Sequence, residues 1–266
     1  MFSRVGAQEP GEACGIETVM VLQGDAILLA GATGRVGGAT LATLVREGAR
    51  VLVVSRSIER ARETIDTMLD GGEVTAASPF VADLNDPAQA AAAVGACVER
   101  FGRIDACVSL AGDSKAVSLR ESTLEDLRSN LRGHVETAYN LTIPALRAML
   151  AQPYRDGARS RGRIVVVSAG SSKQPAPGRG LFGAAKASVN VLMQAIAREH
   201  KADGIVANAL VLGGVATEAA RSYLSAEDLV AAATPQEVAD ALAFLASDHG
   251  SGVNGALVDL NAREVD

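Results

Sequence analysis

The sequence predicts an α/β protein with one Rossmann-type, doubly wound domain of about seven parallel strands and helices on both faces. Short apolar runs of strand length alternate with longer amphipathic segments along most of the 266 residues. This strict alternation predicts parallel strands joined by right-handed crossovers. Hydrophobic residues make up 48% of the chain, aromatic residues only 3%, and Trp is absent. We therefore expect a core of Ala, Val, Leu and Ile, which suits strands buried on both faces.

The expected strands are seven short apolar runs, at residues 26–30, 51–55, 78–82, 106–110, 163–168, 205–211 and 256–260. The expected helices are six longer amphipathic segments, at residues 38–47, 59–69, 87–101, 124–150, 181–200 and 234–247. The fourth helical segment should bend or break near Pro144, because proline lacks the N–H that a helix needs. The last segment starts with an N-cap threonine, a first-turn proline and a glutamate at its third position. Residues 214–233 show only a patchy helical pattern beyond the end of a strand, where ligands bind in such sheets.

Residues 1–22 are expected to form an extension ahead of the domain, which spans residues 23–266. The extension is either disordered or packed on a neighbouring subunit, and acidic residues interrupt it in a way that a signal peptide does not show. The net charge of −6 gives no electrostatic footprint for nucleic acid. No run reaches the roughly 18 apolar residues that span a bilayer.

The three cysteines have no metal-ligand spacing, and their sparse, odd number fits a reducing compartment better than a disulfide framework. We therefore expect a cytoplasmic protein that acts on a small molecule and has no metal, nucleic-acid or membrane partner.

The glycine-rich stretch at residues 31–38 follows the first strand and opens the first helix. This context predicts a dinucleotide-binding loop, although a glycine-rich string alone would be weak evidence. Gly31 permits the tight turn, Gly34 lets the backbone approach a pyrophosphate, and Gly37 or Gly38 permits close packing of helix and strand. The N-terminus of the helix offers unpaired N–H groups and a partial positive charge to the phosphates. The other expected cofactor contacts of this loop are Thr33, Arg35 and Val36.

The end of the second strand selects the cofactor. NAD sites place an acidic residue there for the ribose 2′-hydroxyl, and that residue would repel a 2′-phosphate. This chain has Ser55, Arg56 and Ser57 instead. The Arg56 guanidinium can pair with a phosphate through its planar fork, so NADP(H) is favoured over NAD(H). The alternative is a solvated surface arginine.

Several further landmarks, in this order and spacing, resemble the short-chain dehydrogenase/reductase family over about residues 23–262. Asn130 and Lys186 match two members of the family's catalytic tetrad. Residues 208–217 resemble the segment that caps the nicotinamide, and residues 244–248 resemble a Phe-Leu-x-Ser-Asp helix end. The resemblance implies further cofactor contacts at Asp83, Leu84, Ala111, Gly112, Lys186, Gly213, Val215 and Thr217.

The catalytic positions depart from the family pattern. The family's tyrosine lies four residues before the lysine, where this chain has Phe182. The family's serine lies 13 residues before the tyrosine, where this chain has Ala169. The tetrad therefore reads Asn130, Ala169, Phe182 and Lys186. The phosphate loop also departs, because Arg35 stands at the position of the family's middle glycine.

The missing hydroxyls remove the usual proton donor and a hydrogen bond to the carbonyl. A positioned acid contributes roughly 10²–10⁴-fold to the rate, equivalent to about 3–5 kcal/mol. Ser172, on the loop after the fifth strand, is the first substitute donor that we consider. His134 shares a helix face with Asn130, and Tyr223 lies in the segment that could close over the site. Each of these residues also has a purely structural interpretation.

The leading functional hypothesis is an NADP(H)-dependent reductase of a small carbonyl, quinone or enone substrate with a non-standard proton source. One alternative is a catalytically silent NADP(H)-binding sensor or partner protein. Another is a non-redox enzyme, such as a dehydratase or cyclase, on the same scaffold, because a fold does not fix the chemistry. The resemblance implies a homodimer or homotetramer through residues 124–150 and 181–200.

Overall fold

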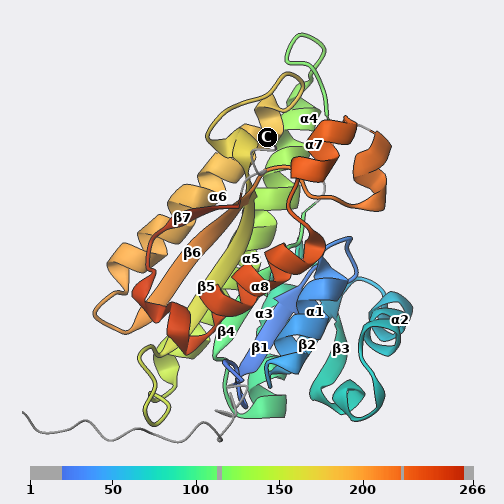
Figure 1. Ribbon diagram of the computed structural model, residues 1–266. Coiled ribbons are helices and arrows are strands. Elements are labelled where there is room, and N and C mark those ends of the chain that lie inside the picture. Colours follow the sequence, from blue (N-terminus) through green and yellow to red (C-terminus); the bar gives the residue numbers. More distant parts are fainter. Residues whose placement is uncertain (1–19, 113–115, 223–224, 261–266) are drawn as a thin grey trace, which may run out of the picture.

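The computed structural model describes residues 20–112, 116–222 and 225–260. Its seven strands form one parallel sheet in the order β3-β2-β1-β4-β5-β6-β7 (Figure 1). The order reverses at β1, so the carboxyl ends of β1 and β4 flank a crevice where such sheets bind ligands. The predicted α/β class with a doubly wound parallel sheet is confirmed.

The strands lie close to their predicted positions: β1 (Ala26–Ala30), β2 (Arg50–Ser55), β3 (Ala77–Val81), β4 (Ala106–Ser109), β5 (Gly162–Ala169), β6 (Ile205–Leu212) and β7 (Leu257–Leu260). The α-helices are α1 (Gly37–Arg46), α2 (Ile58–Met68), α3 (Pro87–Phe101), α4 (Leu124–Asn130), α5 (Thr137–Ala151), α6 (Gly180–Glu199), α7 (Ala226–Ala231) and α8 (Pro235–Ala246). Five short helical segments complete the list: η1 (Gly71–Ala76), η2 (Leu131–Glu136), η3 (Gly170–Ser172), η4 (Glu218–Ser222) and η5 (Asp248–Gly252).

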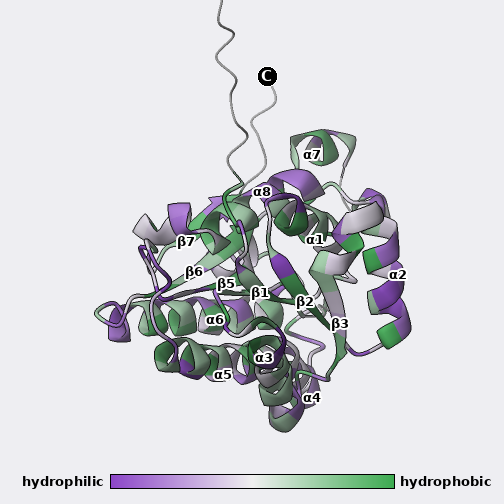
Figure 2. Ribbon diagram, turned by 90° about the horizontal axis from the view of Figure 1, so that it is seen from below, coloured by the Kyte–Doolittle hydropathy of each residue, from purple (hydrophilic) through white to green (hydrophobic). Residues whose placement is uncertain are grey.

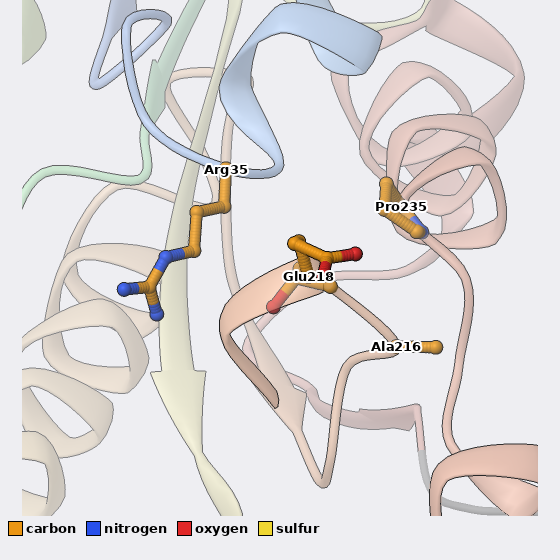
Figure 3. Close-up of a pocket in the computed structure, with 5 residues that line it drawn as sticks. Arg35, Ala216, Glu218 and Pro235 are labelled. Carbon is orange, nitrogen blue, oxygen red and sulfur yellow. The ribbon is translucent and has the colours of Figure 1, made fainter. Parts of the chain in front are cut away.

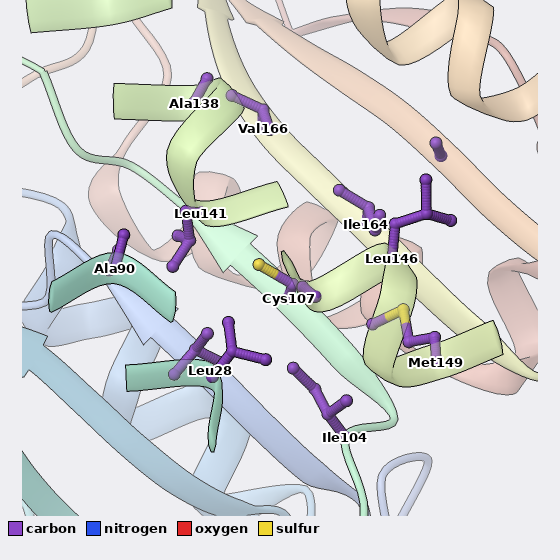
Figure 4. Close-up of a cluster of buried hydrophobic side chains, with 14 of the residues drawn as sticks. Leu28, Ala90, Ile104, Cys107, Ala138, Leu141, Leu146, Met149, Ile164 and Val166 are labelled. Carbon is purple, nitrogen blue, oxygen red and sulfur yellow. The ribbon is translucent and has the colours of Figure 1, made fainter. Parts of the chain in front are cut away.

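The sheet separates two apolar layers because successive side chains of a strand point to opposite faces. Leu28 of β1 packs with α3, α5 and α6, and Figure 4 shows it with Leu141 and Met149. Ile27, its neighbour in the chain, packs on the other face with α1, α2 and α8. Figure 2 shows the two helix layers on either side of the sheet. Helices on both faces explain why the strands are almost continuously apolar.

The break in the long helix is not where the sequence predicted it. Pro144 lies inside α5, which runs without interruption from Thr137 to Ala151. The interruption is η2, a π-helical turn directly after Asn130. Within it the Thr137 hydroxyl donates to the carbonyl of Arg132, five residues earlier, at 2.9 Å. A π-helical turn inside an α-helix is rare and is frequent at functional sites.

Buried charges tie together the amino ends of the strands. Arg163 of β5 is 3% exposed and donates to the Asp25 carboxylate at 2.8 Å. Arg155 also pairs with Asp25, and Asp248 lies 3.4 Å from the second guanidinium nitrogen of Arg163. Burial raises the pKa of Asp25, and the two arginines oppose that rise. This network is distant from the carboxyl ends of the strands, so we treat it as structural.

Two boundary regions differ from expectation in detail. Leu22 is fully buried in the apolar layer of α1, α2 and α8, so the packed domain begins slightly before residue 23. The rest of the predicted extension, residues 1–19, lies outside the described residues. In the patchy stretch 214–233, the structure forms η4 and α7, and Val215 bridges Ala233.

One helix of the described residues, α6, is long and apolar enough to cross a membrane when judged by length and composition alone. It packs on β5 and β6 and buries Lys186 and Asn190 against them. Its other buried residues are Gly183, Ala185, Val189, Met193, Ile196 and Ala197, so α6 packs on the sheet mainly through small and apolar side chains.

Candidate functional site

The glycine-rich loop forms a tight turn between β1 and α1. Gly31 has a φ of +88°, a conformation that favours glycine. A Cβ on Gly37 would lie 2.1 Å from the Gly31 carbonyl oxygen. A Cβ on Gly38 would meet only the flexible Met68 side chain, at 3.1 Å. The structure therefore assigns the close helix–strand contact to Gly37 rather than Gly38.

The start of α1 is open toward this loop. Val36 occupies the N-cap position, and no side chain caps the helix. Its carbonyl accepts bonds from Thr40, but the first-turn N–H groups have no side-chain acceptor. An uncapped helix start with a glycine turn in front of it is a fitting cradle for phosphates.

A cavity of about 510 Å³ opens over the carboxyl ends of β1, β2 and β4. Most of the predicted cofactor contacts line it. Among the described residues, the lining consists of Gly31, Thr33, Gly34, Val54, Ser55, Arg56, Ser57, Arg60, Ala82, Asp83, Leu84, Asn85, Leu110, Ala111, Gly112, Gly133 and Thr137. The cavity joins the phosphate loop, the end of β2 and the end of β4.

The end of β2 presents two arginines to this cavity. Arg56 is the predicted one, and Arg60, in the first turn of α2, is a second that the sequence analysis missed. Its guanidinium donates to the Thr33 carbonyl at 3.4 Å, which holds it beside the phosphate loop. In the sequence, the position of Arg60 in the first turn of the helix that follows β2 could have indicated that it lies near the cofactor cavity.

The two serines beside Arg56 are partly used by the backbone. Ser57 caps α2 by accepting from the Arg60 N–H at 3.2 Å, and its hydroxyl donates to Glu59 at 2.8 Å. The Ser55 hydroxyl accepts from the Ser57 N–H at 3.2 Å. Arg56 and Arg60 are therefore the main groups at this end of the cavity that could bind an anion.

A second hollow, of about 580 Å³, lies between the phosphate loop and the segment after β6. It is lined by Arg35, Ala216, Thr217, Glu218 and Pro235, and Figure 3 shows Arg35 opposite Glu218. Arg35 is exposed, so its side chain is free to reach a phosphate that lies on the loop. The predicted contacts Gly213 and Val215 lie in the same segment, where the Gly213 N–H donates to Leu260 at 3.1 Å.

The structure places Lys186 and Phe182 of α6 beside the carboxyl end of β5. Lys186 of α6 is 6% exposed, and its ammonium donates to the Val167 carbonyl at 2.8 Å. The same nitrogen lies 5.9 Å from the centre of the Phe182 ring. Ala169 ends β5. A phenol at position 182 would thus have the lysine charge beside it, and this chain has no hydroxyl there.

Asn130 lies at the end of α4, immediately before the π-helical turn. It is 6% exposed, and its amide donates to the Asp126 carbonyl at 2.9 Å. Its side-chain oxygen is buried and has no hydrogen-bond partner among the described residues. Such an atom normally binds ordered water in a folded protein.

His134 packs under this site. It is 3% exposed, and its ring meets the Phe182 ring in an edge-to-face arrangement with centroids 5.0 Å apart. Gly112 approaches it so closely that a Cβ on that glycine would lie 2.4 Å from His134 Nδ1. His134 therefore fills the space between the end of β4 and Phe182.

Ser172 lies in η3, directly beyond β5, and its hydroxyl oxygen accepts hydrogen bonds from neighbouring side chains. It accepts from the Asn190 amide at 2.9 Å, and the Ser168 hydroxyl lies at 3.5 Å. These bonds hold η3 against α6. Tyr223 lies outside the described residues.

No group of three or more His, Cys, Asp or Glu side chains in the described ranges could hold a metal ion. Of the three cysteines, Cys97 and Cys107 are described, and both are buried free thiols.

The sheet order, the glycine turn and the cavity at the β1–β4 crevice define a dinucleotide-binding Rossmann protein. The chain belongs to the short-chain dehydrogenase family, because the family model described as short chain dehydrogenase matches residues 25–228. The expected family membership is thereby confirmed.

The similar proteins are oxidoreductases. Oxidoreductase UcpA of Escherichia coli O157:H7 is 31% identical over 251 residues, which cover 88% of this chain and 92% of that protein. The A-factor type gamma-butyrolactone 1′-reductase of Streptomyces virginiae is 31% identical over 245 residues, which cover 86% and 91%.

Solved structures share the fold. A double mutant of a Serratia marcescens short-chain dehydrogenase/reductase matches with a TM-score of 0.79 and 25% identity, over 91% of this chain and 98% of that one. A tyrosine-to-phenylalanine variant of ElxO, solved with NADPH bound, matches with a TM-score of 0.80 and 23% identity, over 89% and 97%.

Proposed function

We propose that this protein is an NADP(H)-dependent reductase of a small organic carbonyl, quinone or enone substrate. The observation that carries the proposal is the pair of arginines, Arg56 and Arg60, in a cavity that is continuous with the glycine turn. No acidic side chain from the end of β2 lines this cavity, so the lining favours a 2′-phosphate over a free 2′-hydroxyl.

The residues present fit a dinucleotide. The glycine turn is tight, because a Cβ on Gly31 or Gly37 would collide with backbone atoms, and the start of α1 beside it has no side-chain cap. In this proposal Arg35 approaches the pyrophosphate, Asp83 and Leu84 border the adenine, and Ala111 and Gly112 lie under the nicotinamide ribose. A bound nicotinamide supplies a hydride. Lys186 contributes a cation beside the reacting oxygen, and Asn130 holds water near it.

The test is NADPH oxidation by the purified protein across a panel of quinones, enones and ketones. We expect turnover of at least one class, with quinones and enones ahead of simple ketones, because their anions are better stabilised without a hydroxyl donor. Tight NADPH binding with no turnover across the panel would remove the reductase and leave the silent binding protein.

The second candidate, a silent NADP(H)-binding protein, is favoured by one specific observation. Both hydroxyl positions, at Phe182 and Ala169, are lost together, whereas the cofactor cavity is retained. The ElxO variant, in which phenylalanine replaces a tyrosine and NADPH is bound, is compatible with cofactor binding in the absence of a tyrosine hydroxyl. Single-turnover measurements with prebound NADPH separate the two candidates.

A prediction follows for cofactor selection. We expect Arg56→Ala and Arg60→Ala each to weaken NADPH binding by about 10-fold or more, because a hydrogen bond to a charged group contributes about 1.5–3 kcal/mol. NADH binding should change by less than about 2-fold, since it has no 2′-phosphate. Fluorescence titration of each variant with both cofactors measures this.

Arg62→Ala is the matched control, because Arg62 is an exposed arginine of α2 outside the cavity lining. Equal losses of NADPH and NADH affinity in the Arg56 variant would contradict the assignment of a 2′-phosphate site.

We also propose a homodimer or homotetramer that packs through α5 and α6, in the cytoplasm. Tyr139 of α5 and Val191 of α6 are apolar side chains that are 51% and 64% exposed. Analytical ultracentrifugation of the wild-type protein and of Val191→Lys tests this assembly.

A further inference from the structure

Lys186 has an unusual environment for a cation. Its side chain is almost fully buried, and the Val167 carbonyl accepts one of its three N–H bonds at 2.8 Å. None of the ion pairs found among residues 20–112, 116–222 and 225–260 includes it. The ammonium is therefore a buried charge with donor capacity left over.

Burial lowers the pKa of Lys186 to about 8, and no charged group contributes to that shift. The side chains that meet Phe182 from neighbouring elements are His134 of η2 and Arg179 ahead of α6. Lys173, at the end of η3, pairs with Asp259 at 2.6 Å. A general acid works best when its pKa lies near the operating pH, and an ordinary lysine is too weak an acid for that.

The Lys186 ammonium also lies near Phe182, the residue at the position of the family's tyrosine. Its nitrogen is 5.9 Å from the centre of the Phe182 ring. With phenylalanine there, position 182 offers no hydroxyl to the Lys186 ammonium.

We propose that Lys186 itself is the proton donor of this reductase, an inference that rests on the function proposed above. The supplied hydride forms the new C–H bond, and the carbonyl π pair moves to oxygen. That oxygen then takes a proton from the Nζ–H bond of Lys186. The lysine is left as a neutral amine, which solvent reprotonates. In the family the lysine assists a tyrosine, whereas here it acts directly on the substrate.

The first test is chemical rescue of Lys186→Ala, assayed at saturating NADPH with the best substrate of the panel. We expect kcat to fall by about 10²–10⁴-fold, the usual contribution of a positioned acid. Ethylammonium should restore at least about 10-fold of that loss, because it fills the vacated space and carries a proton. Tetramethylammonium has the same charge and no proton, and it should restore none. Equal effects of the two cations would overturn the assignment and leave Lys186 a purely electrostatic role.

The second test is the pH profile of kcat. The wild-type rate should fall above about pH 8, where Lys186 loses its proton. Lys186→Arg keeps the charge but cannot lose a proton in this range. The residual kcat of this variant should therefore show no fall above about pH 8. Lys201→Arg, at an exposed lysine, is the control and should keep the wild-type profile. A wild-type limb that persists in Lys186→Arg would overturn the proposal.

The third test needs no cofactor or substrate. The unfolded chain holds this proton up to about pH 10.4, and the folded chain up to about pH 8. Between these values the unfolded state binds more protons, so wild-type stability should rise with pH relative to Lys186→Met. Thermal unfolding of both proteins from about pH 7 to about pH 10 measures the difference. A constant difference would mean an ordinary lysine and would overturn the donor role, even if the protein does oxidise NADPH. Failure of the whole substrate panel instead refutes the proposed function, and the donor assignment with it.

Discussion

The double variant Phe182→Tyr/Ala169→Ser should reduce ketones with NADPH up to about 10²–10⁴-fold faster than the wild-type protein, the gain being smaller the more Lys186 already donates the proton. The phenol would enter a site that already contains its partner, since Lys186 Nζ lies 5.9 Å from the centre of the ring at position 182. A positioned acid contributes this much to a proton transfer. The serine at the end of β5 would add a hydrogen bond to the carbonyl oxygen.

The measurement is kcat for a simple ketone at saturating NADPH, for both single variants and the double variant. Phe244→Tyr, at a partly exposed phenylalanine of α8, is the control for adding a phenol elsewhere. The single serine variant should gain little, because it adds no proton donor. A double variant that binds NADPH normally and gains no activity would show that the site departs from the family in more than these two hydroxyls.

Arg163→Met should destabilise the protein by about 3–5 kcal/mol. Arg163 is 3% exposed and pairs with the Asp25 carboxylate at 2.8 Å. Removing the buried partner of this ion pair leaves the Asp25 carboxylate with only the half-exposed Arg155, and the loss of a buried partner costs about this much. Each kcal/mol corresponds to about 2–4 °C for a domain of this size, so urea and thermal unfolding both resolve the effect.

Arg155→Met is the matched control for this prediction. Arg155 pairs with the same Asp25, but its side chain is 40% exposed. An exposed pair contributes only about 0–1 kcal/mol. Similar losses in the two variants would contradict the argument from burial.

The pH dependence gives an independent check on Arg163→Met. Burial raises the pKa of Asp25, and removing Arg163 raises it further. The folded state then binds a proton that the unfolded state releases, so the stability of the variant falls as pH rises through that window. Its deficit relative to wild type should therefore be smaller near pH 4 than at pH 7.

The sequence by itself determined the class of fold and the place of the site. Strand and helix order follow from local patterns of apolar residues, and the seven strands lie within a residue or two of their predicted positions. The phosphate loop could be located because glycine is required where a strand turns directly into a helix. The absence of hydroxyls at positions 169 and 182 is also a property of sequence spacing alone.

Only the tertiary structure decided how the side chains of the site are used. The close helix–strand contact falls at Gly37 rather than Gly38, because a Cβ on Gly37 would lie 2.1 Å from the Gly31 carbonyl oxygen. Arg60 comes to the cofactor cavity because its guanidinium reaches Thr33, 27 residues away in the chain. Ser172 is turned to Asn190, and the break in the long helix falls beside Asn130 instead of at Pro144.

The burial of Lys186 belongs to this second group. When only its neighbours in sequence are known, a lysine in an amphipathic helix is expected to be exposed to solvent. Packing of α6 on β5 removes water from its ammonium and lowers its pKa. Short-range patterns fix which residues form the elements, whereas desolvation depends on atoms from several elements at once. The sequence thus determined that positions 169 and 182 carry no hydroxyl, and the tertiary structure determined that Lys186 is buried near Phe182.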